Sequence, residues 1–348
     1  MCDHHDEKHG VCFIIPPHIL ENILKMAPDE ALRSRAFDNL HMQGHFRGMR
    51  EGLGLFSFTG LSTGTKRRTI YNARHLRKLP GSLVRSEGAP PSSTDVAINE
   101  AYDFSGNTYD FYSAIFSRNS IDGKGMRLDS TVHYDKSFDN AFWNGQQMVY
   151  GDGDGKLFDR FTKCLDVVGH ELTHGVTQFT AGLQYQDQPG ALNESMSDVF
   201  GILIKQYSLK QTAQQAGWLI GEGLFIPAAG TNRTALRSMK APGTAYNDPL
   251  IGKDPQPAHM KDYYSGSSDN GGVHINSGIP NHAFYLAAVA IGGNAWDIAG
   301  KIWYEVLTTR LHPTSQFADM ARETRDVAKK YGAAAVTAVD SAWKGVGL

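Results

Sequence analysis

The sequence predicts an α+β fold in which a β-rich N-terminal half is followed by a mainly helical C-terminal half. Between about residues 68 and 155, short β-branched and aromatic runs (RTIYNA, MRLDSTVHYD, QQMVYGD) are separated by Gly, Asn, Asp and Pro, which is typical of strands. One helical stretch, roughly residues 95–117, interrupts them, and long helical patterns dominate from about residue 159 onward. We therefore expect a cleft where the two halves meet.

Length, composition and charge exclude several classes of protein. The 348 residues exceed what one hydrophobic core usually serves, so two domains are expected. Lys plus Arg (34) and Asp plus Glu (36) nearly balance, which argues against a general nucleic-acid-binding protein. Three cysteines cannot form a disulfide scaffold, and the longest apolar run, FYLAAVAI, is too short to cross a membrane. No signal peptide is visible, so we expect a cytoplasmic protein, or one exported without a classical signal peptide.

An N-terminal arm precedes the body of the chain. The stretch PPHILENILKMAPDEALRSRAFDNL has a helical period that is broken at Pro28, and residues 46–65 are rich in Gly, Ser and Thr, as in an exposed linker. Composition does not decide between a regulatory segment and a disordered tail. A leading cluster could bind metal, although we favour a tail that chelates adventitiously; it comprises Cys2, His4, His5, His9 and Cys12.

The strongest functional signal is the sequence HELTH at residues 170–174. Apolar residues recur around it at three- and four-residue spacing, which predicts a buried helix. His170 and His174 are i and i+4, so two imidazole nitrogens on one face can bind one Zn²⁺. Glu171 is turned about 100° around the helix, where it can serve as a general base without binding the metal. The alternative is two histidines hydrogen-bonded into the core.

A second predicted helix, ALNESMSDVFGILIKQY, begins near Ala191 and carries a candidate third ligand. Glu194 and Asp198 are i and i+4, and both lie inside an otherwise apolar stretch, which argues against two solvated acids. Glu194 is the candidate zinc ligand, and Asp198 is a candidate acceptor for the other ring N–H of a zinc-binding histidine, His170. Three protein ligands leave a fourth position open to water, as in catalytic zinc sites.

HELTH followed by NESMSD resembles the thermolysin-like zinc metallopeptidases, whose pattern is H-E-x-x-H and then N-E-x-x-x-D. The resemblance extends over NAFWNGQQMVYGDGDG, TAGLQYQ, DNGGVHINSG, YNARH, LPGSL and HPTSQF, and so covers nearly everything from about residue 68 to the end. It implies the two-domain thermolysin-like fold, with a β-rich domain over residues 51–180 that includes the zinc helix, a helical domain over 181–348, and the zinc between them. The implied activity is that of a zinc-dependent neutral endopeptidase, acting as a monomer on proteins or peptides.

The resemblance also implies catalytic roles for individual residues. The zinc ligands would be His170, His174 and Glu194. Glu171 would activate the water. Tyr185 and His274 would stabilise the oxyanion that forms when water adds to the peptide carbonyl, and Asp269 would hold His274 in its tautomer.

Substrate-binding residues follow from the same resemblance. Asn140 and Ala141 would hydrogen-bond a substrate laid down as an extra strand, and Arg237 would bind a substrate carbonyl. The pocket for the residue after the cut bond would prefer a bulky hydrophobic side chain and would be lined by Phe158, Phe161, Val167 and Leu236.

The arm resembles the short prosegment of the protealysin-type branch of this family. The likeness lies in Pro16-Pro17-His18-Ile19-Leu20. In that branch the arm covers the active site and is removed by the protease itself. This implies a self-inhibited, autoprocessed precursor with a prosegment over residues 1–50 that acts as an intramolecular inhibitor, and a cleavage site within about 44–66.

One departure from the family concerns calcium. Asp166 and Glu222 match two ligands of the double calcium site that larger members hold, but Lys205 replaces the shared acidic ligand, and Gly217 and Leu219 stand where other acids align. Calcium needs six to eight oxygens, and too few remain. We expect the double site to be lost and the Lys205 ammonium to pair with the two remaining acids.

Two other functions fit part of this pattern. A zinc aminopeptidase also uses H-E-x-x-H and a distant Glu, but it needs a G-x-M-E-N stretch, which is absent. A zinc-dependent binding protein with an inactive site would not need Glu171, Tyr185 and His274.

The remaining cysteine and histidines carry no functional signal. We expect Cys164 to be a buried small residue. The histidines without a partner pattern are assigned to the surface or core: His75, His133, His259, His282 and His312.

Overall fold

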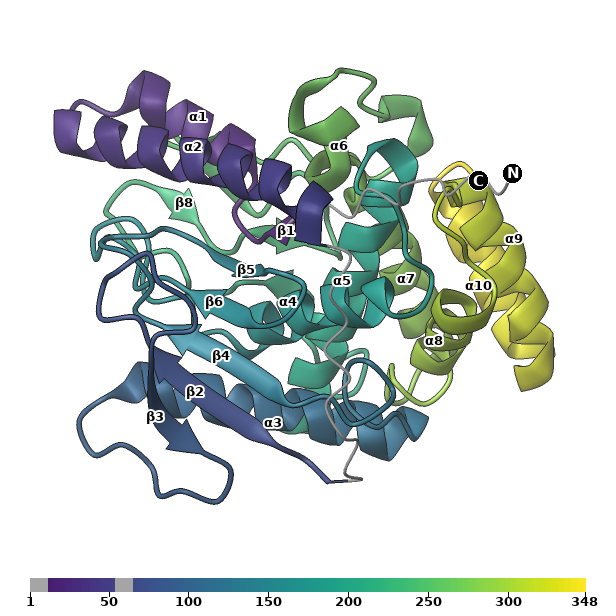
Figure 1. Cartoon of the computed structure of the whole chain (residues 1–348). Helices are drawn as coiled ribbons and strands as arrows, with labels where there is room; N and C mark the ends of the chain where they lie inside the picture. Colours follow the sequence, from purple (N-terminus) through teal and green to yellow (C-terminus); the bar gives the residue numbers. More distant parts are fainter. Residues whose placement is uncertain (1–11, 54–64) are drawn as a thin grey trace, which may run out of the picture.

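A computed structural model of the chain describes residues 12–53 and 65–348, and the side chains of these residues except 45–53. Cys2, His4, His5 and His9 therefore lie outside the described residues. The predicted α+β class is confirmed: a β-rich half precedes a helical half, and a pair of N-terminal helices lies across them (Figure 1). Within the described ranges, no helix is long and apolar enough to cross a membrane.

A six-stranded sheet in the order β1-β5-β6-β4-β2-β3 forms the β-rich half. β4 pairs in parallel with both β2 and β6, and the other neighbours are antiparallel. Strands β2, β4 and β6 coincide with the three runs that the sequence predicted, whereas β1 and β3 were not expected. The strands are β1 (Cys12–Phe13), β2 (Arg68–Asn72), β3 (Ser82–Ser86), β4 (Leu128–Val132), β5 (Ala141–Trp143) and β6 (Met148–Tyr150).

Three long helices pack beside the sheet. α3 (Val96–Phe116) matches the predicted helical stretch, because the Asp95 carboxylate accepts the N–H groups of the first turn and Ser117 ends the helix with φ 54°. The helix that carries HELTH is α4 (Leu165–Gln178), and it packs along α5 (Asp187–Leu209). α5 begins four residues earlier than predicted, because Pro189 lies in its first turn, where no backbone N–H is needed.

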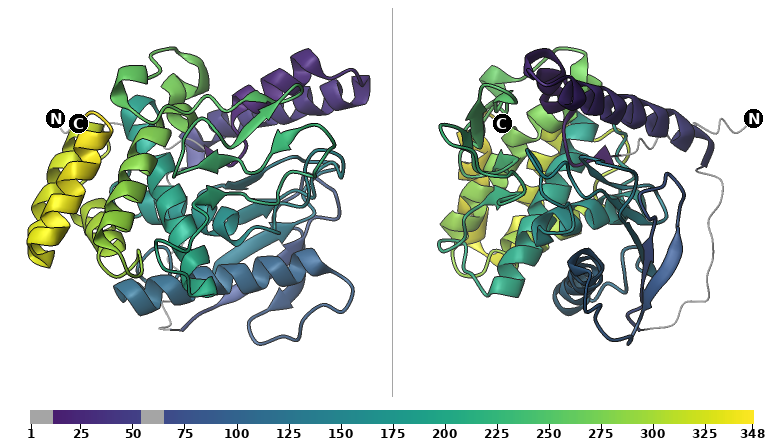
Figure 2. Two further views of the ribbon diagram at one scale, coloured as in Figure 1. Left: turned by 180° about the vertical axis from the view of Figure 1, so that it is seen from behind. Right: turned by 90° about the vertical axis from the view of Figure 1, so that its left-hand side faces the viewer.

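The C-terminal half consists of helices joined by short strands (Figure 2). Trp303 and Trp343 stack at its centre, with ring centroids 6.1 Å apart. The helices are α6 (Ser268–Asn276), α7 (Gly278–Ile291), α8 (Ala299–Thr309), α9 (Phe317–Ala328) and α10 (Ala333–Gly345), with short 3-10 helices at Met260–Asp262 and Lys329–Tyr331. The strands are β7 (Leu219–Ile220), β8 (Asn232–Arg233), β9 (Arg237–Ser238), β10 (Tyr246–Asp248) and β11 (Gly252–Lys253).

The N-terminal arm folds into two packed helices, α1 (Pro17–Met26) and α2 (Glu30–Leu53), separated at Pro28 as predicted (Figure 1). The prediction of a linker from residue 46 is wrong in its first part, because α2 continues through Leu53. The helix formers in FRGMREGL offset its two glycines. The predicted prosegment boundary at residue 50 thus falls within α2, and residues 54–64 of the predicted cleavage region lie outside the described residues.

The arm is anchored to the body by apolar burial and by long-range hydrogen bonds. Its buried apolar side chains are Ile14, Ile15, Ile19, Leu20 and Ile23, each at most 2% exposed. His18 Nε2 lies 2.8 Å from the Tyr246 hydroxyl, and the Asn22 amide donates to the carbonyl of Ile251 at 2.9 Å. The arm therefore packs as part of the molecule, which argues against the disordered tail considered above.

His133 lies between two carboxylates. Its Nδ1 is 2.8 Å from Asp152, in the loop after β6, and its Nε2 is 2.9 Å from Asp95, the N-cap of α3. The His75 ring also approaches Asp152, at 3.4 Å. The hydrogen bond with Asp152 outweighs burial and, together with Asp95, raises the pKa of His133 to about 9. At neutral pH the ring is therefore an imidazolium that joins the sheet to the start of α3.

We predict a pH-dependent contribution of His133 to stability. Because its folded-state pKa of about 9 lies above its ordinary value of 6.5, the contribution is complete below about pH 6.5 and disappears as the pH rises through 9. His133→Asn, which tolerates the φ of 55° at this position, should lower the free energy of unfolding by about 1–3 kcal/mol at pH 6. Urea titrations of both proteins should converge by pH 10. A difference independent of pH, as we expect for the exposed control His312→Asn, would contradict the assignment.

Candidate metal centre and substrate site

Close contact between α4 and α5 brings the motifs HELTH and NESMSD together. A Cβ added to Gly201 would lie 2.5 Å from the carbonyl oxygen of Asp166, and one added to Gly169 would lie 2.8 Å from Ile204 Cδ1. The two glycines therefore let the helices approach more closely than side chains would allow. This approach places HELTH on α4 opposite NESMSD on α5.

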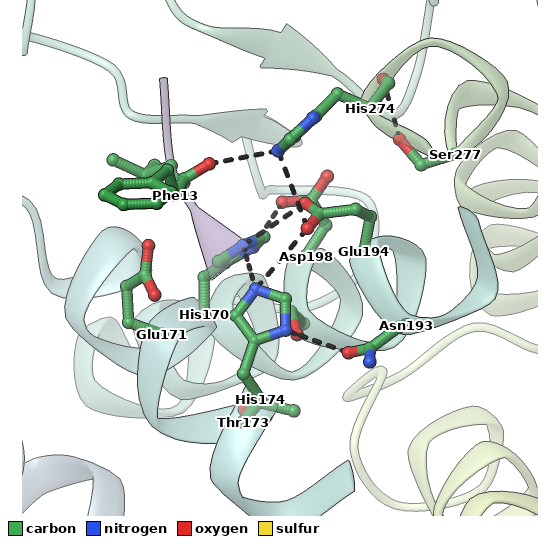
Figure 3. Close-up of polar contacts among 12 residues, drawn as sticks. Phe13, His170, Glu171, Thr173, His174, Asn193, Glu194, Asp198, His274 and Ser277 are labelled. Atoms are coloured by element: carbon green, nitrogen blue, oxygen red, sulfur yellow. Dashed lines mark hydrogen bonds and ion pairs between the residues drawn. The ribbon is translucent and has the colours of Figure 1, made fainter. Parts of the chain in front are cut away.

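Three buried side chains converge between these helices (Figure 3). The Nε2 atoms of His170 and His174 are 3.0 Å apart, and Glu194 oxygens lie 3.5 Å from the first and 3.6 Å from the second. Burial lowers the pKa of His174 to about 3, so this ring is neutral, as a metal ligand must be. Glu194 Oε2 is buried and accepts no hydrogen bond. Facing nitrogens beside an unsatisfied carboxylate oxygen fit a divalent cation, and this donor set suits zinc.

Partners on the far side of each imidazole fix its orientation. His170 Nδ1 lies 2.8 Å from Asp198 Oδ1, and His174 Nδ1 lies 2.8 Å from Asn193 Oδ1. These contacts turn both Nε2 atoms toward Glu194. The Asn193 contact was missed from the sequence, although this residue opens the NESMSD motif.

Asp198 connects the candidate metal centre to Arg237, the candidate substrate-binding arginine. Its carboxylate accepts two hydrogen bonds from Arg237, at 2.7 and 2.8 Å, and one from Asn281 at 2.9 Å. Burial favours the neutral acid, but Arg237 and His170 outweigh it and hold the pKa of Asp198 below its ordinary value. An ionised Asp198 thus orients a metal-binding ring and a guanidinium together.

Glu171 lies beside the converging ligands and points away from them (Figure 3). Its Oε2 accepts the backbone N–H of Trp143 in β5 at 3.0 Å, and its Oε1 is buried and accepts no hydrogen bond. Burial and the nearby charge of Glu194 raise its pKa well above the ordinary value. A carboxylate in this environment has a high affinity for a proton, as a general base near a metal requires.

Tyr185 and His274 form the opposite wall of the site. The Tyr185 hydroxyl donates to Glu194 and lies 3.2 Å from His274 Nε2. Asp269 accepts the backbone N–H of His274 at 2.8 Å and contacts its Nδ1 at 2.6 Å. Burial alone would lower the pKa of His274, but Asp269 and Glu194 together outweigh burial, so the net shift of its pKa is upward.

A strained loop positions Asp269 for this contact. Residues 269–272 all have positive φ, between 50° and 81°. Gly271 is required here, because a Cβ would lie 1.9 Å from Asp187 Oδ1. The loop thus places an acid directly behind the His274 ring.

The first described residues of the arm run along the edge strand of this site. β1 pairs antiparallel with β5, matching Cys12 to Trp143. Beyond the strand, Ile14 N–H donates to Ala141 O at 3.2 Å and Ile15 N–H donates to Asn140 Oδ1 at 3.0 Å. Asn140 and Ala141 therefore bind an extended backbone laid beside β5, and here that backbone is the arm.

Two side chains bind the carbonyl oxygens of the same stretch. His274 Nε2 donates to Phe13 O at 3.0 Å (Figure 3). Arg237 Nη1 donates to Ile14 O at 3.3 Å. Three candidate substrate-binding groups, Asn140, Ala141 and Arg237, and the candidate catalytic residue His274 thus converge on residues 13–15.

The four candidate pocket residues, Phe158, Phe161, Val167 and Leu236, are all buried, at most 1% exposed, and they belong to one apolar cluster that also contains Ile14. The Phe158 and Phe161 ring centroids are 5.8 Å apart. The structure thus brings together the candidate metal, catalytic and backbone-binding residues, and it places the four candidate pocket residues in the apolar core that Ile14 also enters.

Lys205 occupies the position where the family resemblance implies a missing calcium ligand. Its Nζ lies 3.5 Å from both Asp166 Oδ2 and Glu222 Oε2. Burial alone would lower the pKa of Lys205. The two carboxylates raise it by more than burial lowers it, so the net shift is upward and the ammonium form is stabilised.

Cys164, at the N-cap of α4, is buried as expected.

Two family models together match most of the chain. The thermolysin metallopeptidase catalytic domain matches residues 59–178, and the thermolysin metallopeptidase α-helical domain matches residues 181–348. An extracellular metalloprotease of Pectobacterium carotovorum is 49% identical over 345 residues, covering 97% of this chain and 96% of the relative. Protease PrtS of Photorhabdus is 48% identical over 321 residues, covering 89% and 82%.

A solved structure extends the similarity to the arm. The precursor of protealysin, a metalloproteinase from Serratia proteamaculans, superposes with a TM-score of 0.87 at 51% identity, covering 97% of this chain and 99% of that one. This confirms the predicted thermolysin-like two-domain fold, with a sheet-rich catalytic domain and a helical C-terminal domain. The chain therefore belongs to the thermolysin family of zinc metallopeptidases and is a metalloendopeptidase.

Proposed function

We propose that the chain is the self-inhibited precursor of a neutral zinc endopeptidase that cuts on the N-terminal side of bulky hydrophobic residues. The observation that carries the proposal is the position of residues 13–15, whose backbone is held beside the candidate metal ligands. Phe13 O bonds to His274, and Ile14 follows it. In a substrate bound in the same way, the carbonyl at Phe13 would be the one attacked and the side chain at Ile14 would enter the apolar pocket.

The catalytic roles follow from the geometry of the side chains. Zinc held by His170, His174 and Glu194 would act as a Lewis acid and lower the pKa of the attacking water. Glu171 would take the proton from that water and deliver it to the leaving nitrogen, because its free Oε1 and raised pKa suit proton transfer. His274 would donate to the oxyanion from the atom that now binds Phe13 O, with Tyr185 beside it.

The arm would inhibit by occupying these same groups, and the enzyme would remove it by cutting the chain beyond α2, within about residues 44–66. The relative named an extracellular metalloprotease supports export as the destination of this protein.

The Lys205 ion pairs support loss of the double calcium site. A positive charge already lies 3.5 Å from each of Asp166 and Glu222, so a calcium ion there would be repelled. The Lys205 ammonium would then perform the charge-neutralising part of the role of calcium.

The first test is Glu171→Gln. Loss of the general base should lower kcat/KM for a casein or furylacryloyl-peptide substrate by at least about 10²–10⁴-fold. Zinc should remain at one equivalent, since Glu171 is not a ligand, and the arm should stay attached. Glu305→Gln, at a half-buried position of α8 that pairs with Lys330 and lies outside the candidate site, serves as the control. Arm removal in the purified Glu171→Gln protein would show that another protease performs the processing, and N-terminal sequencing of the wild type would locate the cut.

The second test measures preference at the position after the cut bond. In a peptide series that varies only this residue, Leu, Ile or Phe should give kcat/KM values about 10- to 100-fold above Ala, which is the gain expected from burying a large apolar side chain. Leu236→Ala should enlarge the pocket and shift the preference toward Phe relative to Leu. Equal rates for Ala and Leu in the wild type would count against the pocket.

The third test addresses calcium. Calcium or EGTA should leave the Tm of the wild type unchanged, because Lys205 already neutralises Asp166 and Glu222. Lys205→Met should destabilise the protein by about 1–3 kcal/mol, since it leaves the buried Asp166 carboxylate without its counter-ion. Lys78→Met, at an exposed position, serves as the control. A calcium-dependent rise in the wild-type Tm, or a calcium ion between Asp166 and Glu222 in crystals, would refute the substitution.

A further inference from the structure

We propose that Cys12 of the arm is a fourth ligand of the zinc in the precursor and takes the position that the catalytic water needs. The inference rests on the zinc site proposed above. It assigns a function to a cysteine that the sequence grouped with a chelating N-terminal tail, whereas the structure buries it in β1, at 3% exposure.

The position of Cys12 relative to the candidate ligands is the first observation. One ligand atom each from Cys12, His174 and Glu194 lie within 4.8 Å of one another, and all three residues are buried. The side chain of Cys12 packs with Tyr185 and Val273, which line the same side of the site. The Cys12 sulfur therefore lies within reach of a metal ion held by His174 and Glu194.

The unsatisfied carboxylate oxygen of Glu194 is the second, independent observation. Glu194 Oε2 is buried without a hydrogen-bond partner while the arm is in place, and it lies 3.5 Å from His170 Nε2. A buried carboxylate oxygen without a donor, beside an imidazole nitrogen, fits a cation held between them. The arm therefore covers a site that is built for a metal ion.

The register of β1 explains why the thiol points inward. Successive side chains of a strand point to opposite faces, so Cys12 and Phe13 diverge. Phe13 is buried on the other face of β1, where it packs against Phe142 with ring centroids 5.0 Å apart. Pairing with β5 and the hydrogen bonds of Ile14 and Ile15 fix this register. A shift by one residue would turn the thiol away.

Charge and ligand type favour coordination over packing alone. Two neutral imidazoles and one carboxylate leave a zinc site with a charge of about +1, and a thiolate would make it neutral. Neutrality matters in a site from which the arm excludes solvent, because an uncompensated buried charge is costly. Zinc accepts sulfur, nitrogen and oxygen ligands in tetrahedral sites, so the four donors form a reasonable closed set.

Coordination by Cys12 also accounts for the survival of a substrate-like arm. The carbonyl of Phe13 is bound by His274, and Ile14 is bound by Ala141 and Arg237, as proposed for a substrate. Cleavage requires a water beside Glu171. If the thiolate fills the remaining position on the metal, that water has no place, and the Phe13–Ile14 bond stays intact.

The experiment compares full-length precursors in the Glu171→Gln background, where the arm is expected to remain attached. Zinc content and zinc-edge X-ray absorption would be measured for the parent, Cys12→Ser and Cys12→Ala. The parent should show one sulfur neighbour at about 2.3 Å, and both variants should lose it while retaining the metal. Cys164→Ser is the matched control, since this other buried cysteine should leave the sulfur signal unchanged. Cys2→Ser controls for the remaining thiol.

The outcomes separate this inference from the zinc site itself. One equivalent of zinc with only nitrogen and oxygen neighbours in the parent overturns the role of Cys12 and leaves the proposed peptidase intact. A sulfur signal that persists in Cys12→Ser also overturns it. Absence of metal from all the proteins would count against the zinc site and this inference together. In the protein that retains Glu171, Cys12→Ser should lose its arm faster than the wild type. An unchanged rate of arm loss would contradict coordination of the zinc by Cys12.

Discussion

The structure depends on the stabilisation of a buried group of metal ligands. Two imidazole nitrogens 3.0 Å apart, next to a carboxylate oxygen that accepts no hydrogen bond, would be unfavourable in an apolar interior without a cation. The surrounding structure is arranged around that requirement: Gly169 and Gly201 let α4 and α5 approach, and Asp198 and Asn193 hold the two rings. The fold and the metal centre are therefore mutually dependent.

Asp198 shows how closely binding and chemistry are linked in this site. The same carboxylate contacts His170, Arg237 and Asn281, so the orientation of a metal ligand and of a substrate-binding group depends on one residue. Asp198 is also the only strong counter-charge that the described residues offer to the buried Arg237 guanidinium. A change at this position would affect metal retention, substrate binding and stability together, and activity alone would not distinguish them.

Local spacing was sufficient to predict the parts of the site that lie on single helices. The i,i+4 pairs His170–His174 and Glu194–Asp198 face one another as their spacing suggested, because helix geometry fixes side-chain directions over one turn. Contacts across long separations left no such signal. The arm meets the edge strand about 125 residues away, and His133 meets Asp95 across 38, so neither partner could be found by periodicity. Cys12 was misassigned for the same reason, since pairing with β5, and not its neighbours in sequence, determines its environment.

The anchoring of the arm implies that cutting the chain and opening the site are separate events. Residues 13–15 use the groups proposed for substrate, but α1 is held independently, through His18 to Tyr246 and Asn22 to Ile251. A cut beyond α2 breaks the covalent link and leaves these contacts intact. While the link exists, the arm binds at a high effective concentration, so substrate competes poorly. Under the proposed function, the arm could dissociate and be degraded once the link is cut, and only then would His274, Asn140 and Arg237 become available to another chain. Inhibition would then end with loss of the arm, and cleavage would be the step that makes this loss irreversible.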